Sequence, residues 1–509
     1  MTLPGLHLLD DIYTNGPGLS IFGRDVPILP TLLAIFVASR VVKLLKGIRE
    51  VNGLTGFRVP FQPYAPPSAF LPSAWWNITI DHIWGWRHTG RPTIFTSNIE
   101  VAKQFLAGSG DQKASSVTLG RSFGKSEDGN RVLEKWGNNL VTAADGDVWR
   151  KHRRIVGPAF NNKLYEMVWA ETLNTYRQME TIEGWEGKDA VTVPAMDNIT
   201  TKLALLVISR CGFGLPFDWA APPVAPDGKM SVQEALRVLT KSHIVALLMP
   251  DWVRYLPLPG FSKIREAFKF FSGFMESQIA ERTAEVRSGS ERAEERMDAF
   301  TMIVRANEQE EGKLRLNDRE VIGNVFIMLF AGHETTAHAL AATIALLALH
   351  QDIQNDILKQ ITDVVGYERD PTFDDYPNLD KVLNAFYEAL RLFQYNPRYF
   401  EDPTAFKPSR WASSEPGSES RSEFSDLSAF FGFSIGPRAC IGRKFATTEA
   451  VAFLTMLLRD WHVEPALRGG KNGEVETEEE WRERVMGNPD VVLTLCVKDA
   501  PMRFTRRRP

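Results

Sequence analysis

The sequence predicts a mainly α-helical fold, and two observations support this prediction. Three segments show the apolar spacing of long helices: residues 317–350, residues 379–391 and the residues that follow position 440. No Gly/Ser-rich linker divides the 509 residues, so we expect one large domain after a short N-terminal segment, although length alone would allow about three domains of ~150 residues. Hydrophobic residues make up 44% of the chain, which is enough to bury a large core.

The charge balance and the cysteines narrow the possible function classes. Lys and Arg number 59 and Asp and Glu 63, so the net charge of −4 gives no support to nucleic-acid binding. The three cysteines, Cys211, Cys440 and Cys496, lie far apart in the sequence, which argues against a disulfide framework. We therefore expect the body of the protein in a reducing compartment.

Residues 1–54 are predicted to be a membrane anchor and hinge. Val26 to Ala38 form an apolar run shorter than the ~20 residues of a full span, so a tilted or monotopic anchor competes with a transmembrane helix. A cleaved signal peptide is disfavoured because its basic residues would precede the apolar run. Here they follow it, which predicts that the rest of the chain stays in the cytosol. These basic residues are Arg40, Lys43, Lys46 and Arg49.

The first candidate site residues are Trp149 and Arg153 in the segment GDVWRKHRRIVGPAF. They lie four residues apart, so on a helix they share one face. Taken alone, such a pair is more often a cation–π or surface contact than part of a binding site.

The longest predicted helix begins with a cap at Asn317 or Asp318, has Glu320 near its third position and continues to about His350. Residues 325–332 are apolar on all sides, which predicts a buried helix. The run is too short and too soon polar to be a membrane span.

The middle of this helix carries the segment AGHETT, residues 331–336. Gly332 costs about 1 kcal/mol relative to Ala in a helix, so we expect it to leave room for a ligand. The hydroxyl of Thr335 can turn away from its own backbone to bond that ligand. His333 and His338 lack the spacing of a His-Glu-x-x-His metal site, so packing roles are expected for them.

An amphipathic helix over residues 379–391 carries Glu388 and Arg391 at positions i and i+3. Such pairs are common on helices and usually contribute only tenths of a kcal/mol, about 0.2–0.5. Arg410 follows in the segment Phe406-x-Pro-x-Arg-Trp.

The most informative segment is FSIGPRACIG, residues 433–442. Its glycines, Gly436 and Gly442, let the backbone pass close to a flat cofactor. Arg438 stands two residues before Cys440, where it can pair with a carboxylate of that cofactor. A helix is predicted to follow Cys440, so its sulfur would lie at a helix N-terminus, where free N–H groups and partial positive charge stabilise a thiolate.

This segment resembles the haem-ligand signature of the cytochrome P-450 family, Phe-x-x-Gly-x-Arg-x-Cys-x-Gly, at every fixed position. The resemblance runs from about residue 55 to 509 and implies that family's fold, mainly α with a small β region. It implies a haem b cofactor with the Cys440 thiolate as axial ligand. The residues implied to surround the haem are Phe433, Gly436, Arg438, Gly442, Trp149 and Arg153, with Arg438, Trp149 and Arg153 at its propionates.

The resemblance assigns two further groups of residues. The AGHETT segment is similar to the family's oxygen-activation motif, in which Glu334 and Thr335 would relay protons to dioxygen. Glu388, Arg391 and Arg410 match a buried network that supports the cysteine loop. Its role would be structural, and removing one partner would leave a buried charge unpaired.

The chain departs from the family pattern between Phe393 and Asn396. Only Gln394 and Tyr395 stand where family members have a sheet-rich segment, so several strands with their turns, on the order of 40 residues, are missing. In the family this segment supplies strands of the main sheet and one wall of the substrate pocket. Both ends of the gap match the family closely, which favours an exon lost from the gene model or transcript over a natural compact variant.

The resemblance implies a monooxygenase that inserts one oxygen atom into an apolar small molecule. Electrons would come from NADPH through NADPH-cytochrome P-450 reductase, with cytochrome b5 as an optional partner, at the endoplasmic reticulum membrane and with the catalytic domain facing the cytosol. Two alternatives stay open. One is a haem-thiolate isomerase or dehydratase acting on peroxides, and the other is a non-catalytic product of an incomplete gene model. The identity of the substrate does not follow from the sequence.

Overall fold

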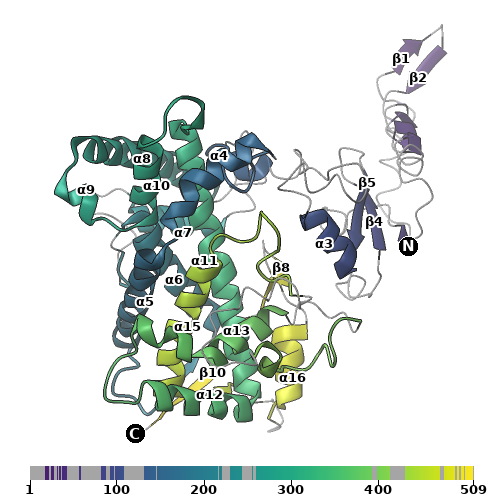
Figure 1. Ribbon diagram of the computed structural model, residues 1–509. Helices are drawn as coiled ribbons and strands as arrows, with labels where there is room; N and C mark the ends of the chain where they lie inside the picture. Colours follow the sequence, from purple (N-terminus) through teal and green to yellow (C-terminus); the bar gives the residue numbers. More distant parts are fainter. Residues whose placement is uncertain are drawn as a thin grey trace, which may run out of the picture. The chain divides into compact units, whose positions relative to one another are not determined.

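The computed structural model describes most of the chain after residue 130 and separate pieces before it (Figure 1). The described ranges are 18–21, 24–27, eight positions between 31 and 42, 57–58, 82–86, 92–96, 98–107, 131–144, 146–215, 217–220, 230–242, 255, 260–391, 398–412, 430–469, 475–487, 490–491, 495–497 and 499–507. The chain divides into two compact units, residues 1–102 and residues 103–509.

The second unit is mainly helical, as the sequence predicts. Its α-helices are α4 (Asp147–Val156), α5 (Asn162–Ile182), α6 (Met196–Phe213), α7 (Val232–Lys241), α8 (Phe261–Ser288), α9 (Glu291–Glu295), α10 (Ala299–Glu308), α11 (Asp318–Leu349), α12 (Gln351–Val364), α13 (Asp380–Arg391), α15 (Arg443–Asp460) and α16 (Glu478–Arg482). Short helical turns lie at Arg131–Glu134, Gly157–Ala159, Gly312–Leu314, Phe373–Asn378, Pro408–Trp411 and Glu483–Gly487.

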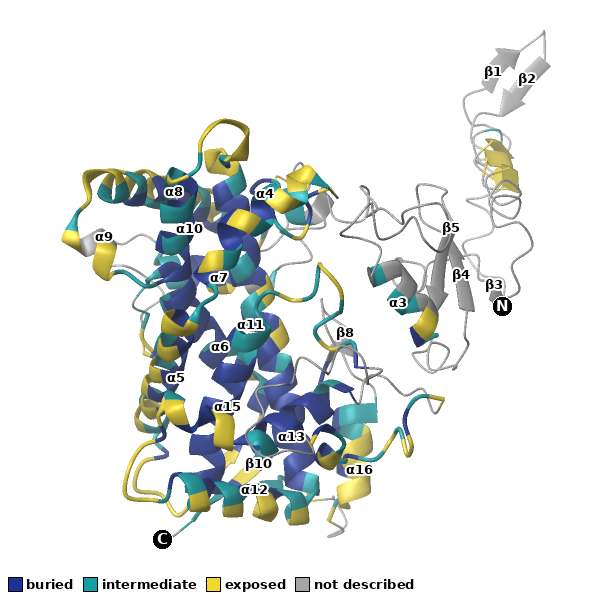
Figure 2. Ribbon diagram, viewed as in Figure 1, coloured by how far each residue is buried: buried dark blue, intermediate teal, exposed yellow. Residues whose placement is uncertain are grey.

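Helix α11 runs through the middle of this unit and is buried along most of its length (Figure 2). It begins where the sequence predicts. Asn317 is its N-cap and forms a capping box with Glu320, and His350 is its C-cap. Helix α6 packs along α11, and a Cβ atom added to Gly332 would lie 3.2 Å from Cδ1 of Ile208. The mid-helix glycine therefore allows close packing of the two helices.

Helices α13 and α15 pack against α11 and complete the core around the site. The predicted helix at residues 379–391 is α13, and the predicted helix after Cys440 is α15, which begins at Arg443 with Gly442 as its N-cap. Helix α15 also packs along α5. These contacts fix the start of α15, and with it the cysteine loop, against the buried face of α11.

The β structure of this unit is small. Strand β10 (Met502–Arg506) pairs antiparallel with both β6 (Ala190–Val193) and β7 (Trp461–Pro465), and β8 (Asp490–Val491) pairs with β9 (Leu495–Cys496). Met502 and Phe504 alternate with more exposed residues and face the core, as expected for a sheet with one buried face. Residues 392–397 lie outside the described residues, so the predicted gap is not seen directly. No strand lies within 398–412.

The first unit contains short strands and helical pieces. Its strands are β1 (Gly18–Ile21), β2 (Arg24–Pro27), β3 (Phe57–Arg58), β4 (His82–Trp86) and β5 (Pro92–Thr96), and α3 (Ile99–Ala107) follows them. β1 pairs with β2, and β4 pairs with both β3 and β5. The predicted apolar run thus begins in a strand, and its described positions from 31 onward are helical. Among the described residues no helix is long and apolar enough to cross a membrane.

Candidate active site

The cysteine loop is held by its own backbone hydrogen bonds. The N–H of Cys440 donates to the carbonyl of Phe433 over 2.8 Å, and the N–H of Ala439 donates to the carbonyl of Gly436 over 3.0 Å. Gly436 has a φ of +75°, a conformation that favours glycine. The backbone of the loop therefore explains why a glycine stands at this position of the FSIGPRACIG segment. Gly442 lies beside the sulfur, because a Cβ atom there would be 3.8 Å from Sγ of Cys440.

The thiol of Cys440 opens into a cavity rather than into close-packed core. Removal from bulk water raises the pKa of this thiol, while a hydrogen bond from the N–H of Gly442 and the positive charges of Arg443 and Arg153 oppose that rise. The loop by itself therefore does not make the thiol acidic. A cation bound to the sulfur would supply the missing stabilisation of the thiolate.

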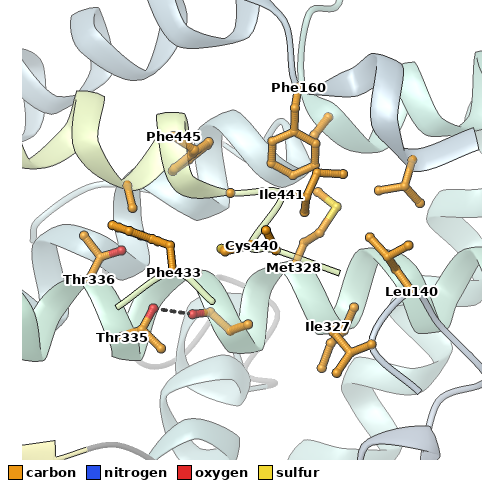
Figure 3. A pocket seen from close by; sticks show the side chains of 18 of the residues that line it. Leu140, Phe160, Ile327, Met328, Thr335, Thr336, Phe433, Cys440, Ile441 and Phe445 are labelled. Carbon is orange, nitrogen blue, oxygen red and sulfur yellow. Dashed lines mark hydrogen bonds between the residues drawn. The ribbon is translucent and has the colours of Figure 1, made fainter. Parts of the chain in front are cut away.

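This cavity has a volume of about 370 Å³ and is lined mainly by apolar side chains (Figure 3). Its walls come from the cysteine loop, the segment around Leu140 and six helices that include α4, α6, α11 and α13, together with the start of α15. Among the predicted site residues, those that line it are Trp149, Arg153, Thr335, Phe433, Arg438, Cys440 and Gly442. Glu334 and Gly436 are not among the lining residues. The structure thus places a single thiol in an apolar chamber together with a few polar groups.

Two arginines and a tryptophan gather on one wall of this cavity. The guanidinium carbon of Arg438 lies 5.2 Å from the ring centroid of Trp149, so Trp149 has Arg438 as its cation–π neighbour. The same guanidinium donates to the carbonyl of Ala143 over 2.7 Å and to that of Leu140 over 3.4 Å. Arg153 lies on the same helix as Trp149 and lines the same cavity. This wall can therefore accept the carboxylates of a ligand.

The middle of α11 contributes the other polar group that the sequence predicts for this cavity, the hydroxyl of Thr335. Thr335 is exposed to the cavity, and its hydroxyl donates to the carbonyl of Ala331 over 2.7 Å. The sequence suggested that this hydroxyl turns away from its own backbone, and that expectation is wrong for the structure. The hydroxyl instead donates to the carbonyl four residues earlier, as helical threonines can do. Its oxygen still faces the cavity as an acceptor. Glu334 is buried one residue before it. His333 is buried and its Nδ1 lies 2.9 Å from the carbonyl of Leu329.

A buried ionic network joins α13 to the segment that follows it. Arg391 donates to Oε1 of Glu388 over 2.8 Å, and both side chains are 0% exposed. Nε of Arg410 lies 3.3 Å from the same oxygen, and the indole N–H of Trp411 donates to Oε2 over 2.7 Å. Arg391 also donates to the carbonyl of Pro403 over 2.7 Å. Residues far apart in the chain thus share one buried carboxylate.

Glu388→Ala should lower the free energy of unfolding by about 3–5 kcal/mol, because Arg391 would stay buried without its partner. Thermal unfolding followed by circular dichroism measures this loss. The matched control is Asp363→Ala, which removes the exposed i,i+4 pair with Lys359 and should leave the melting temperature almost unchanged. Equal small shifts in both variants would contradict a structural role for the network.

The chemistry of the donor set fits haem b. Among the described residues there is no group of three or more His, Cys, Asp or Glu side chains that could hold a metal ion. Cys440 is the one such side chain among the described residues that line the cavity, and a single thiolate suits a metal whose other ligands belong to a macrocycle. The arginines and the indole N–H on the cavity wall suit its propionates. The apolar lining suits the face of the ring.

Comparison with protein families supports this interpretation. The model of the family described as Cytochrome P-450 matches residues 75–395 and 393–486. The match falls into two parts that meet at residues 393–395, where the sequence predicts a missing segment.

Curated relatives and solved structures agree with the family match. Cytochrome P-450 monooxygenase 124 of Postia placenta is 32% identical over 447 aligned positions, covering 78% of this chain and 82% of that protein. Since 78% of 509 residues is about 397, about 50 aligned positions carry a gap in this chain. Cytochrome P-450 monooxygenase prx9 of Penicillium rubens is 27% identical, covering 67% and 70%. A zebra fish cytochrome P-450 structure with progesterone superposes with a TM-score of 0.62 at 16% identity over 84% of this chain and 96% of that one.

The family match covers most of the chain, and the solved structure shares its fold. The thiol of Cys440 opens into an apolar cavity whose donor set fits haem b. This chain belongs to the cytochrome P-450 family of haem-thiolate monooxygenases and is therefore an oxidoreductase.

Proposed function

We propose that the protein inserts one oxygen atom from dioxygen into an apolar organic molecule, with electrons from NADPH delivered by a flavoprotein reductase. The observation that supports this most is that Cys440 and Thr335 face the same largely apolar cavity. Apolar side chains of α6, α11 and α13, including Ile208, Ile327 and Phe386, would contact the substrate.

Each site residue has a proposed role. When bound, haem would supply the oxygen chemistry, and the thiolate of Cys440 would hold its iron. Trp149, Arg153 and Arg438 would bind the propionates, while Phe433 packs beside the ligand loop. Gly436 provides the turn, and Gly442 leaves space beside the sulfur.

Proton delivery is proposed for two neighbouring residues of α11. Thr335 would hold a proton at Oγ1 on the cavity surface, and Glu334 would resupply it from the buried side of the helix. Of these two residues only Thr335 lines the cavity, so Thr335 would face the bound ligand and Glu334 would act behind it.

Thr335→Ala should lower product formed per NADPH consumed by about 100-fold, the lower end of what general acid–base catalysis contributes. Haem content and substrate affinity should not change, because the hydroxyl acts after both have bound. Peroxide should rise as product falls, and both are measured in the reconstituted enzyme with its reductase.

The matched control for this variant is Thr343→Ala. Thr343 lies two turns further along α11 and makes the same hydrogen bond to the carbonyl four residues earlier, also over 2.7 Å, but it does not line the cavity. It should couple NADPH use to product like the wild type. Unchanged coupling in Thr335→Ala would contradict the proton role. Wild-type turnover of a peroxide substrate without any reductase would instead favour an isomerase or dehydratase.

Partner binding and location are also proposals. A reductase, with cytochrome b5 as an optional partner, would approach from the side of the cysteine loop. On α4, three basic residues already form ion pairs: Arg150 with Asp147, Lys151 with Glu320 and Arg154 with Glu310. These pairs reduce the positive charge that α4 could offer to an acidic redox partner.

We propose that residues 1–54 attach the haem domain of residues 55–509 to the cytosolic face of the endoplasmic reticulum membrane. The support is a group of exposed apolar side chains in the helical positions between 31 and 42, with Val42 64% and Ile35 60% exposed. A helix that presents exposed apolar side chains can lie in the interface of a membrane.

Deletion of residues 1–50 should release the protein from membranes into the soluble fraction, because the exposed apolar group is lost. Membrane fractionation followed by immunodetection measures this. The haem spectrum should be unchanged, since none of the proposed haem contacts lies in that segment. Full-length protein in the soluble fraction would refute the anchor.

A further inference from the structure

A buried amide joins helices α4 and α11 beside the cavity. Asn324 of α11 is 0% exposed and lines the cavity, and His152 of α4 is also 0% exposed. The carboxamide nitrogen of Asn324 lies 2.8 Å from Nδ1 of His152 and donates to the carbonyl of Glu320 over 2.7 Å. Its carboxamide oxygen accepts from the backbone N–H of Leu140 over 2.8 Å.

These contacts fix the protonation of His152. The N–H of Leu140 can only donate, so the atom that faces it must be the carboxamide oxygen of Asn324. The other atom is then the NH₂ group, whose two hydrogens serve Glu320 and His152. Nδ1 of His152 must therefore be an unprotonated acceptor. The ring is neutral, with its hydrogen on Nε2.

The charged groups around His152 agree with this state. Nε2 lies 3.6 Å from Oε1 of Glu320, whose two oxygens also accept from Nζ of Lys151 over 2.9 Å each. Burial lowers the pKa of His152, and the positive charge of Lys151 acts in the same direction, whereas Glu320 and Asn324 oppose it. The neutral ring is thus favoured by its surroundings as well as by hydrogen-bond geometry.

The same amide reaches Arg438 through the loop of residues 137–144. Asn324 binds the N–H of Leu140, while Arg438 donates to the carbonyls of Leu140 and Ala143. This loop lies directly on α11, because a Cβ atom added to Gly323 would be 2.6 Å from the carbonyl oxygen of Gly137. The loop therefore transmits the position of α11 to the guanidinium of Arg438.

We propose that Asn324 is a positioning residue that aligns Arg438 with helix α4 for binding of the haem propionates, and that His152, as the neutral Nε2–H tautomer, is its fixed partner on α4. His152 lies between Trp149 and Arg153 on that helix. The carboxamide of Asn324 therefore contacts both the helix that carries these two residues and the loop that binds Arg438. This inference rests on the proposed haem site.

The tautomer of His152 is the first test. Nitrogen-15 spectra of the ferrous carbon monoxide complex, which is diamagnetic, should show an unprotonated Nδ1 in the wild type, with the signal assigned by its loss in His152→Gln. Asn324→Asp places an oxygen against Nδ1 and should shift the hydrogen onto Nδ1. A protonated Nδ1 in the wild type would overturn the inference, whether or not the variant folds.

Haem release is the second test. Asn324→Ala leaves the N–H of Leu140 without its partner and should speed haem transfer to a scavenger protein by about tenfold or more. If Asn324 acts through Arg438, its effect should fall to less than about twofold in an Arg438→Ala background. A full additive effect in that background, or release at the wild-type rate from Asn324→Ala, would overturn the positioning role.

Asn307→Ala is the matched control. Asn307 is a buried asparagine of α10 that binds both backbone groups of Leu316, over 2.7 and 3.1 Å, and it does not line the cavity. It should cost stability without changing haem release. Faster release from this control, equal to that from Asn324→Ala, would show that general destabilisation explains the effect. A wild-type chain that binds no haem would contradict the proposed function and with it the positioning role, whereas the His152 signals of that protein would still show whether its Nδ1 is unprotonated.

Discussion

Cys440→Ala should abolish haem binding by the folded protein. Cys440 is the only His, Cys, Asp or Glu side chain among the described residues that line the cavity, and the thioether of Met328, which also lines it, carries no charge and cannot supply a thiolate. The ratio of haem to protein after reconstitution measures the effect, which should be a loss to background. Retained secondary structure in circular dichroism would show that the variant still folds.

The control for this experiment is Cys496→Ala. Cys496 is a buried cysteine of β9, outside the cavity, where it packs as a small apolar residue. It should keep full haem occupancy. Haem bound by Cys440→Ala at the wild-type ratio would contradict the assignment of the ligand.

Restoring a family-like segment of about 40 residues between Phe393 and Asn396 should raise both haem occupancy and thermal stability. The sheet that this segment supplies in the family would otherwise lack strands and their backbone partners. Several unpaired buried groups at about 1–3 kcal/mol each approach the whole stability of a domain. The break in the family match at residues 393–395 supports a loss at this place.

The comparison needs a control of equal length, a Gly/Ser segment inserted at the same position. This Gly/Ser control should raise neither haem occupancy nor the melting temperature, because it adds residues that provide no strands to the sheet. Absorbance of bound haem and the melting temperature are measured for all three proteins. Equal values in the 509-residue chain and the restored chain would show that the short form is a genuine compact variant.

The elements that could be predicted from the sequence depend on local signals. Helix α11 begins at Asp318 because Asn317 and Glu320 form a capping box that four consecutive residues of sequence already specify. Helix α15 follows Cys440 closely for a similarly local reason, since Gly442 can end the loop and serve as N-cap. Such features need no knowledge of the tertiary fold.

The residues that were missed make contacts between distant parts of the chain. Asn324 and His152 are 172 positions apart, and although His152 lies between Trp149 and Arg153, nothing in the sequence pairs it with Asn324. The carbonyls that Arg438 binds lie 298 and 295 positions earlier, so the sequence suggested only a propionate as its partner. The glycines at positions 137 and 323 are the one related feature that the sequence contains. The sequence does not show, however, that their backbones lie in contact.

The spectrum of the reduced carbon monoxide complex tests the central claim most directly. If the thiolate of Cys440 holds the iron, the complex should give the strongly red-shifted Soret band that sulfur ligation produces. The measurement applies to any haem that the 509-residue chain or its restored form binds. A red-shifted band is the predicted result. A band typical of histidine ligation in the folded wild-type protein would contradict the assignment of Cys440 as the axial ligand.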